Sequence, residues 1–358
     1  AYLLGLWPDS ADYKLLIQER GRIAALDEAQ SQPVSAGALL KLGATGPRVL
    51  ELKNRLLGPD DHTDVFDEAL DRSVRIFQDS ANLQTDGLVG AATLAVLNAT
   101  RVDWIGRLDA NLERWRWLPQ QTPEDYISVN IAAFEMQAVR RGVEEFAMRV
   151  VISQPFRETP VFAEDMRYFV VNPYWNVPFK LATEDKLPKL QSNPQDLADT
   201  GYQVRPAGDE AFIGVTQIDW SCVNRGNFNF LLRQQPGPEN ALGRIKFMMP
   251  NDYAVYLHDT NDRSLFLKRE RSFISGCIRL SEPEQLASWL LHREGRPEDA
   301  AKLSAQIAGG TTRTINLRQP VPVYIVYFTA SRSVDSDLVF RRDIYQRDAR
   351  IVQALRDA

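Results

Sequence analysis

The spacing of apolar residues changes once along this chain, near Pro119 and Pro123. Before these prolines, apolar residues recur every three or four positions, which is typical of amphipathic helices. After them, segments such as residues 126–131 and 148–153 alternate between apolar and polar side chains, as half-buried strands do. We therefore expect a helical N-terminal part joined to a largely β part.

The helical part divides into three predicted segments. Residues 1–36 are expected to form a helical N-terminal scaffold, and residues 37–100 a compact module of three helices. Residues 101–125 are expected to be a helical connector. The three-helix module is small enough to lie near the limit of independent stability.

The β part is predicted to span residues 126–346, followed by a C-terminal tail at residues 347–358. Residues 178–240 interrupt it, because they show little periodicity and are rich in Pro, Gly, Asn and Gln. Long aperiodic stretches inside a compact domain usually carry function. The fold class predicted is α+β and multi-domain, with a mainly β domain that carries a lid-like insertion.

Composition excludes several classes of protein. The chain is 44% hydrophobic and 25% charged with a net charge of −5, which is ordinary for a globular protein. The chain has no block rich in Lys and Arg, so its charge pattern does not indicate a nucleic-acid partner. The chain also contains no run of eighteen apolar residues, so no membrane span is predicted. Because Ala1 is not a natural start, we expect a signal peptide or an N-terminal anchor upstream of it.

His258 and Cys277 stand nineteen residues apart in a chain with only two cysteines and three histidines. A thiol is a strong nucleophile only as the thiolate, so it needs a nearby base or positive charge. Gly276 predicts a tight turn before Cys277. A buried structural cysteine is the alternative to a nucleophile.

The run that ends at His258 alternates, so Ala254, Tyr256 and His258 are expected to share one face of a strand. The other face is expected to point into an apolar layer through Tyr253, Val255 and Leu257.

The second cysteine, Cys222, lies in a stretch rich in Trp, Asn and Gly with no His nearby, and we expect it to be packed. A disulfide between Cys222 and Cys277 remains an alternative, but two cysteines are too few for a small secreted domain that disulfides hold together. No cluster of Cys and His has the spacing of a zinc site, so neither a metal nor another cofactor is expected.

The residues around the His258–Cys277 pair resemble the L,D-transpeptidase family, which has a YkuD-type catalytic domain. The family signature is a His, a spacer and then Ser/Thr-His-Gly-Cys, and this chain has Ser275-Gly276-Cys277-Ile278-Arg279 at the second part. Ser275 replaces the His of most members, as is common in the large gram-negative subgroup. Ile274 departs from the polar residue that is usual at its position.

Further motifs also resemble that subgroup. They are the segments 114–119 (RWRWLP), 172–178 (NPYWNVP), 236–243 (PGPENALG) and 343–345 (DIY). Residues 38–98 separately resemble the small helical peptidoglycan-binding-like domain, with matching marks at residues 42–43, 46–49, 77–78 and 83–93. Together the resemblance covers the chain from about residue 8 to residue 346.

The resemblance implies a β-sandwich catalytic domain that performs acyl transfer on peptidoglycan stem peptides. Cys277 is then the nucleophile that forms a thioester, and His258 is the base that later serves as acid. Backbone N–H groups around Gly276 and Cys277 are expected to stabilise the oxyanion, and Ser275 is counted among the catalytic residues as part of the motif. The family also forms carbapenem adducts at this thiol.

Four further residues are predicted to bind substrate. The Tyr256 hydroxyl is placed to reach the reacting carbonyl, with packing as the alternative. Arg279 is expected to bind a substrate carboxylate rather than a surface carboxylate. Trp175, with Asn172 in the same motif, is expected to line the acyl-donor pocket, or else to belong to the core. The side chain of Asp259 is expected to point away from His258, whose ring a backbone carbonyl orients in this family.

The implied partners are donor and acceptor stem peptides and other proteins of cell-wall synthesis, in the periplasm of a gram-negative bacterium. Two alternatives remain open at this stage. An L,D-carboxypeptidase or cysteine peptidase would pass the acyl group to water, and a non-catalytic wall-binding protein would use the His/Cys pair structurally. The sequence does not decide whether the helical module binds glycan.

Overall fold

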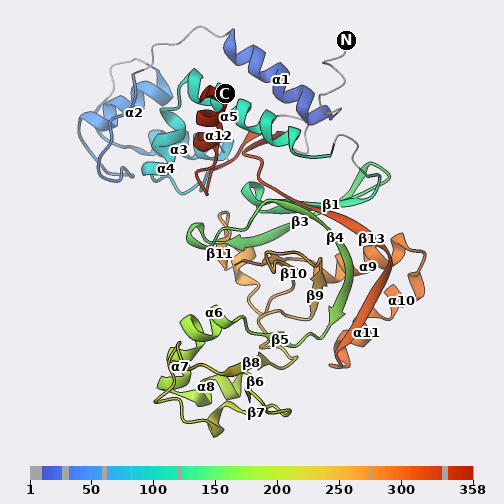
Figure 1. Cartoon of the computed structure of the whole chain (residues 1–358). Helices are drawn as coiled ribbons and strands as arrows, with labels where there is room; N and C mark the ends of the chain where they lie inside the picture. The colour runs from blue at the N-terminus through green and yellow to red at the C-terminus, as the bar shows by residue number, and fades with distance from the viewer. Residues whose placement is uncertain are drawn as a thin grey trace. The chain divides into compact units, whose positions relative to one another are not determined.

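The computed structural model describes residues 10–25, 32–58, 63–81, 83–119, 123–274, 276–332 and 338–357. The chain forms two compact units (Figure 1). The helical unit consists of residues 1–122, 130–133 and 327–358, and the sheet unit consists of residues 123–129 and 134–326.

The helical unit is built from helices and one short sheet. Its helices are α1 (Ala11–Ala24), α2 (Pro47–Leu57), α3 (Glu68–Ser80), α4 (Ala91–Leu97), α5 (Arg101–Arg116) and α12 (Asp348–Asp357). Its sheet pairs β14 (Ala330–Arg332) with β15 (Leu338–Phe340).

Helices α2, α3 and α4 are the three helices predicted for residues 37–100. Pro47 opens α2, where a missing backbone N–H removes no intrahelical bond. Apolar residues at helical spacing in α2 and α3, such as Val49, Leu52, Leu70 and Val74, are fully buried in a common core. The module therefore has a hydrophobic core of its own.

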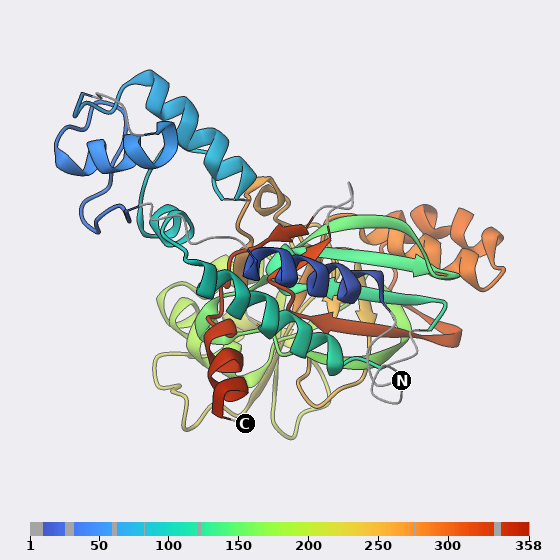
Figure 2. The same cartoon turned by 90° about the horizontal axis from the view of Figure 1, so that it is seen from above.

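Helix α5 is the centre of the rest of the helical unit, with α1 and α12 alongside it (Figure 2). Its first turn is closed by a capping box between Thr100 and Asp103. Its last turns hold α12 through an ion pair of 2.6 Å between Arg114 and Asp348. Residues 347–358, expected to be a tail, thus contain a helix.

The C-terminal boundary of the β part differs from the prediction. The sheet unit ends at Val326, whereas the β part was predicted to extend to residue 346. The reason is that the chain after the last strand packs on α5: the Thr329 hydroxyl donates to Asp348 and accepts from the Asn111 side chain, both at 2.8 Å. Alternating patterns do not reveal this kind of packing.

The sheet unit is built on nine strands in the order β11-β3-β12-β10-β9-β4-β13-β1-β2. They are β1 (Tyr126–Asn130), β2 (Glu135–Arg140), β3 (Val143–Ser153), β4 (Phe162–Val171), β9 (Ile245–Met248), β10 (Leu257–His258), β11 (Ser272–Ile274), β12 (Ile278–Leu280) and β13 (Arg313–Val326). Because β2 also pairs with β3, the sheet closes on itself. One continuous sheet thereby supplies the opposed layers expected of a sandwich.

Inward-facing apolar residues fill this closed sheet. Phe169 and Phe247, from β4 and β9, are fully buried with their ring centroids 5.7 Å apart. The helices α9 (Pro283–Arg293), α10 (Pro297–Ala301) and α11 (Leu303–Ala308) follow β12. A hydrogen bond of 2.6 Å from Trp289 to Glu145 fixes α9 to β3. Among the described residues, the short 3-10 segments are Ile131–Ala133, Pro155–Arg157, Val215–Gln217 and Ser264–Leu267.

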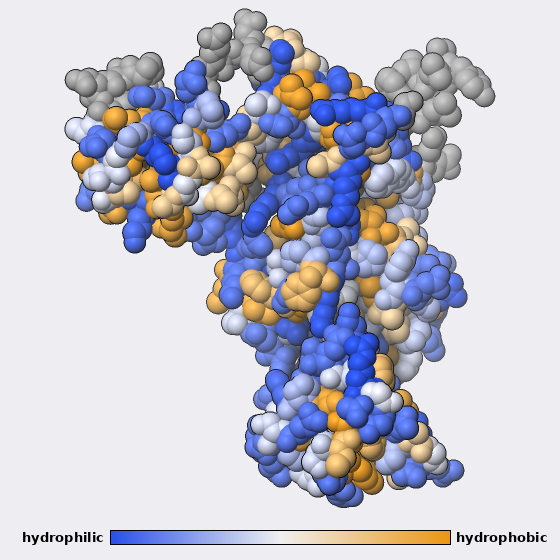
Figure 3. Space-filling view, turned by 60° about the vertical axis from the view of Figure 1, so that its left-hand side comes forward, coloured by the Kyte–Doolittle hydropathy of each residue, from blue (hydrophilic) through white to orange (hydrophobic). Residues whose placement is uncertain are grey.

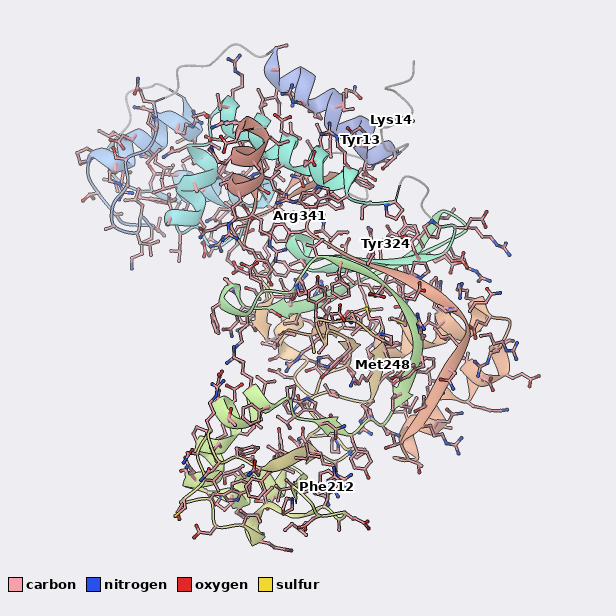
Figure 4. All side chains as sticks on the ribbon, in the orientation of Figure 1. Tyr13, Lys14, Phe212, Met248, Tyr324 and Arg341 are labelled. Carbon is pink, nitrogen blue, oxygen red and sulfur yellow. The ribbon has the colours of Figure 1, made fainter. Side chains whose placement is uncertain are left out.

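The predicted insertion is a small subdomain with its own sheet and core. Its elements are β5 (Trp175–Asn176), α6 (Phe179–Leu181), a π-helical turn (Ala182–Lys186), α7 (Leu187–Ser192), α8 (Pro194–Asp199), β6 (Tyr202–Pro206), β7 (Ile213–Gly214) and β8 (Phe230–Gln234). Its strands run in the order β5-β8-β6-β7, and its core includes Val204, Trp220 and Leu232. Phe212, labelled in Figure 4, packs against the guanidinium groups of Arg205 and Arg233. This subdomain extends from Trp175 to Leu242, slightly beyond the predicted 178–240.

Hydrophobic residues on the face drawn in Figure 3 form separate patches between hydrophilic ones. Among the described residues, none of the helices combines the length and the apolar character that crossing a membrane requires.

Candidate active site

Three neighbouring strands of the sheet unit carry the candidate site. In β10, His258 lies opposite Lys246 of β9 on one side and Arg279 of β12 on the other. Residues in register on adjacent strands point to the same face of a sheet. His258 therefore lies between two cationic side chains. Met248, two residues after Lys246 in β9, is labelled in Figure 4.

Cys277 lies two residues before Arg279, and Tyr256 lies two residues before His258. Cys277 and Tyr256 are neighbours in the structure. The backbone N–H of Ile278 donates to the Tyr256 carbonyl at 3.2 Å, and the Tyr256 side chain forms a hydrogen bond with the Cys277 thiol. The rings of Tyr256 and His258 have centroids 5.6 Å apart. Gly276 has a φ of +81°, so it provides the left-handed turn that delivers Cys277 to this position.

The segment before His258 differs in part from the predicted strand. Val255 and Leu257 are buried as expected, but only Leu257 and His258 form β10. Ala254 has a φ of +54°, which ends the alternation. Tyr253, predicted to face the apolar layer, is 58% exposed and rests on the ring of Phe162. The turn at Asp252 and Tyr253 therefore lies where the sequence predicted strand.

The tautomer of His258 follows from its hydrogen bond. His258 Nδ1 lies 2.5 Å from the backbone oxygen of Asp259, and a carbonyl oxygen only accepts, so Nδ1 carries the proton. Nε2 is then free of a proton. Burial and the positive charges of Arg279 and Lys246 lower the pKa of His258 to about 3. The ring is thus a neutral base at pH 7.

The carboxylate of Asp259 does not orient the imidazole. It accepts from the backbone N–H of Arg244 at 2.8 Å and pairs with Arg263 at 3.2 Å. The side chain of Asp259 thus points away from His258 and a backbone carbonyl holds the ring, as expected from the sequence.

The low pKa of His258 makes stability dependent on pH. Below the ordinary histidine pKa of about 6.5, the unfolded chain binds a proton that the folded protein does not bind until about pH 3, so acidification favours unfolding. Between pH 7 and pH 5 this term should lower the free energy of unfolding by about 2 kcal/mol. Urea unfolding at both pH values should show a loss larger by about that amount in the native protein than in His258→Asn. Equal losses would contradict the buried neutral ring.

The thiol of Cys277 is subject to opposing influences. Burial raises its pKa, while the hydrogen bond from Tyr256 and the charges of Lys246 and Arg279 lower it. Burial dominates, so the group is a thiol in the resting state. Deprotonation therefore requires a base.

Tyr256→Phe should raise the pKa of the Cys277 thiol, because the hydroxyl donor to the sulfur is removed. A hydrogen bond to a charged group contributes about 1.5–3 kcal/mol, so the shift should be about one to two pKa units. The pH dependence of alkylation by iodoacetamide measures it. Tyr253→Phe, which removes an exposed hydroxyl, is the matched control and should leave the profile unchanged. Identical profiles for Tyr256→Phe and the native protein would exclude this role.

The backbone N–H of Gly276 is already used within the protein. It donates to the Ser153 hydroxyl at 2.6 Å, and Ser153 itself accepts from the Thr159 hydroxyl at 3.0 Å. This engagement argues against Gly276 as the oxyanion donor expected from the sequence. Ser275 lies outside the described residues. Ser153 ends β3 and belongs to no recognisable motif, so sequence reasoning missed it.

Trp175 and Asn172, predicted together, have different environments. Trp175 packs in the insertion core against Tyr202 and forms a side-chain hydrogen bond with Tyr256, so it contacts the site indirectly. The Asn172 amide donates to the backbone oxygens of Gln306 and Ile307 at 3.1 and 3.0 Å. Asn172 is buried at a φ of +49°, and this role in fixing the chain argues against substrate binding.

Two cations complete the site. Arg279, predicted from its place after the cysteine, is half-buried, and its Nε has no hydrogen-bond partner among the described residues. Lys246 was not predicted. Its only sequence signal is a charged residue between Ile245 and Phe247, both fully buried, which places it on the opposite face of β9.

The other cysteine takes no part in this arrangement. Cys222 is exposed rather than packed, and both cysteines are free, so the alternative of a disulfide is wrong. Within the part of the chain that the structure describes, no group of three or more His, Cys, Asp or Glu residues is placed to hold a metal ion.

Comparison with known sequences agrees with the resemblance. Residues 124–325 match the family model of the L,D-transpeptidase catalytic domain (YkuD), and residues 45–97 match that of the "Putative peptidoglycan binding domain". A Haemophilus influenzae protein described as "Putative L,D-transpeptidase" is 34% identical over 245 residues, which are 68% of this chain and 48% of that protein. The chain thus spans about half the length of this curated relative.

Solved structures give weaker likenesses. An L,D-transpeptidase of Xylanimonas cellulosilytica matches with 14% identity and a TM-score of 0.22, over 82% of this chain and 100% of that one. An L,D-transpeptidase of Stackebrandtia nassauensis matches with 12% identity and a TM-score of 0.25, over 82% of this chain and 96% of that one. At these scores the fold assignment rests on the sheet described above and on the family models. The catalytic-domain match covers more than half of the chain, and the protein belongs to the L,D-transpeptidase family.

Proposed function

We propose that this protein is a cysteine-dependent L,D-transpeptidase of cell-wall biogenesis that acts on peptidoglycan stem peptides. The observation that carries the proposal is the grouping on one sheet face of the Cys277 thiol, a neutral His258 and the Tyr256 hydroxyl. Membership of the family supports the choice of reaction and substrate.

In the first half-reaction, His258 Nε2 takes the proton of the Cys277 thiol. The thiolate attacks the carbonyl carbon that joins the L-centre of the third stem residue to the terminal D-residue. His258 then returns the proton to the leaving amine, the C–N bond breaks, and the D-residue departs. The stem peptide remains on Cys277 as a thioester.

In the second half-reaction, an amine acceptor attacks the thioester and gives its proton to His258. The new amide forms as the C–S bond breaks, and the proton on His258 restores the thiol. The acceptor is a second stem peptide, which gives a 3–3 cross-link, or an attached lipoprotein. At the end of the cycle the acyl group is on the acceptor, and Cys277 and His258 are in their starting protonation states.

Stabilisation of the oxyanion is assigned to the Tyr256 hydroxyl together with the backbone N–H of Cys277. Burial raises the pKa of Tyr256, so its hydroxyl stays protonated and remains a donor at neutral pH. Arg279 is proposed to bind the carboxylate of the terminal D-residue, and Trp175 to hold Tyr256 in place from the insertion.

The insertion, Trp175–Leu242, is proposed to act as a lid that keeps water from the thioester. This role decides between transfer and hydrolysis. The module at residues 45–97 is proposed to bind the cell wall, and the periplasm of a gram-negative bacterium is the proposed location.

Product analysis tests the proposal. The protein is incubated with a disaccharide carrying a tetrapeptide stem, and the products are separated by chromatography and identified by mass. Cross-linked dimers are the expected product. Trimmed tripeptide alone would replace this function by L,D-carboxypeptidase activity. No product and no carbapenem adduct would favour a non-catalytic wall-binding protein.

A further inference from the structure

Lys246 is a largely buried cation at the candidate site. Its Nζ lies 4.0 Å from the centroid of the Tyr256 ring, and its strand position is opposite His258. Burial lowers the pKa of Lys246, and negative charge on the Cys277 sulfur opposes this shift. The ammonium group therefore interacts electrostatically with the reacting sulfur.

The second cation, Arg279, has the matching position on the other side of His258. Its Nε is buried without a hydrogen-bond partner, and the carboxylate of Asp262 acts on it only through charge. Among the described residues, no carboxylate forms an ion pair with Lys246 or Arg279. Elsewhere in the chain, the buried Lys53 pairs with Asp67 at 2.6 Å.

A buried cation without an anionic partner is costly, and an anionic ligand removes that cost. The terminal D-residue of the proposed donor supplies such an anion. Its α-carboxylate carbon lies three bonds from the carbonyl carbon that Cys277 attacks. Lys246 and Arg279 flank His258 on the neighbouring strands, so this carboxylate is the donor group that we place against them.

We propose that Lys246, together with Arg279, forms a two-cation site beside Cys277 that selects acyl donors with a free carboxylate next to the scissile bond and stabilises the thiolate as His258 takes the thiol proton. The selection of donors by Lys246 rests on the proposed function, because that function supplies the substrate. The positive field of Lys246 at the Cys277 sulfur does not depend on the proposed function. The two parts can therefore be tested separately.

Alkylation of Cys277 tests the field without any peptidoglycan. In this reaction the thiolate forms a C–S bond to the reagent as iodide leaves. Iodoacetate carries a negative charge and iodoacetamide does not. The ratio of their rates, divided by the same ratio for N-acetylcysteine, therefore reports the charge near the sulfur. Lys246→Met should lower this ratio about tenfold relative to the native protein.

Three further variants control the experiment. Lys246→Gln is measured beside Lys246→Met, so that misfolding of one variant does not decide the result, and Lys246→Arg should restore the native ratio. Lys268→Gln removes an exposed lysine that also contacts an aromatic ring, that of Phe273, and should change nothing. An unchanged ratio in both Lys246→Met and Lys246→Gln would overturn the proposal.

Selectivity is measured with tetrapeptide donors whose terminal carboxylate is free or amidated. The preference in kcat/KM for the free acid should fall about tenfold in Lys246→Met. If the native protein transfers no acyl group but the alkylation ratio responds as expected, the proposed function fails and the cationic site stands. If transfer occurs and neither measurement responds to Lys246, the cationic site fails alone.

Discussion

Cys277→Ser is expected to abolish acyl-enzyme formation and to lower turnover on the order of 10⁴-fold or more. A serine hydroxyl is far less acidic than a thiol, and the neutral His258 is a weak base because its pKa lies near 3. The oxyanion donors remain in this variant, so binding of the donor should persist while chemistry stops. Turnover and intact mass after addition of donor measure the two effects.

The chain offers a matched control for this substitution. Cys222→Ser changes a free, exposed cysteine in the insertion and should retain native turnover and a native adduct. An adduct of normal yield in Cys277→Ser, or its loss in Cys222→Ser, would move the nucleophile away from Cys277.

His258→Gln is expected to lower kcat by about 10²–10⁴-fold, the usual contribution of a positioned general base. Burial keeps the Cys277 thiol protonated, so the loss of the base should be partly offset as pH rises and hydroxide ionises the thiol. The native rate should show no acid limb near pH 6.5, because His258 stays neutral to about pH 3. The pH dependence of kcat and kcat/KM measures both features.

His292→Gln controls for the loss of a histidine. His292 lies in the last turn of α9, exposed, with Nδ1 at 2.8 Å from the backbone oxygen of Ser288. This variant should behave like the native protein. A native rate in His258→Gln would show that another group accepts the thiol proton.

Local patterns in the sequence predicted much of the fold. The three helices of the module were predicted because their apolar residues share helical faces and Pro47 and Gly87 mark a helix start and a turn. Gly87 has a φ of +74°. Strands β1 and β3 were predicted from the alternation of apolar and polar residues. The order of the strands in the sheet was not predicted, because the pairing of strands that are far apart in the sequence, such as β4 with β13, is not encoded in periodicity.

Site residues that belong to a sequence motif were predicted. A site residue that is placed only by the pairing of neighbouring strands was missed. Cys277, His258 and Arg279 lie within the family signature. Lys246 belongs to no motif, and only its pairing opposite His258 places it at the site. Asn172 was assigned to the substrate because it stands in a motif, but its amide supports backbone carbonyls of the sheet unit. A motif thus marks a place in the fold and does not by itself assign contact with substrate.

The central claim is that Cys277 carries the acyl group, and rapid-quench intact mass spectrometry tests it most directly. Protein mixed with tetrapeptide-stem donor should gain the mass of the donor minus its terminal D-residue. Fragmentation should place this mass on Cys277, and adding an amine acceptor should discharge it into cross-linked product. Cross-linking without such an adduct, or an adduct on any other residue, would contradict the account.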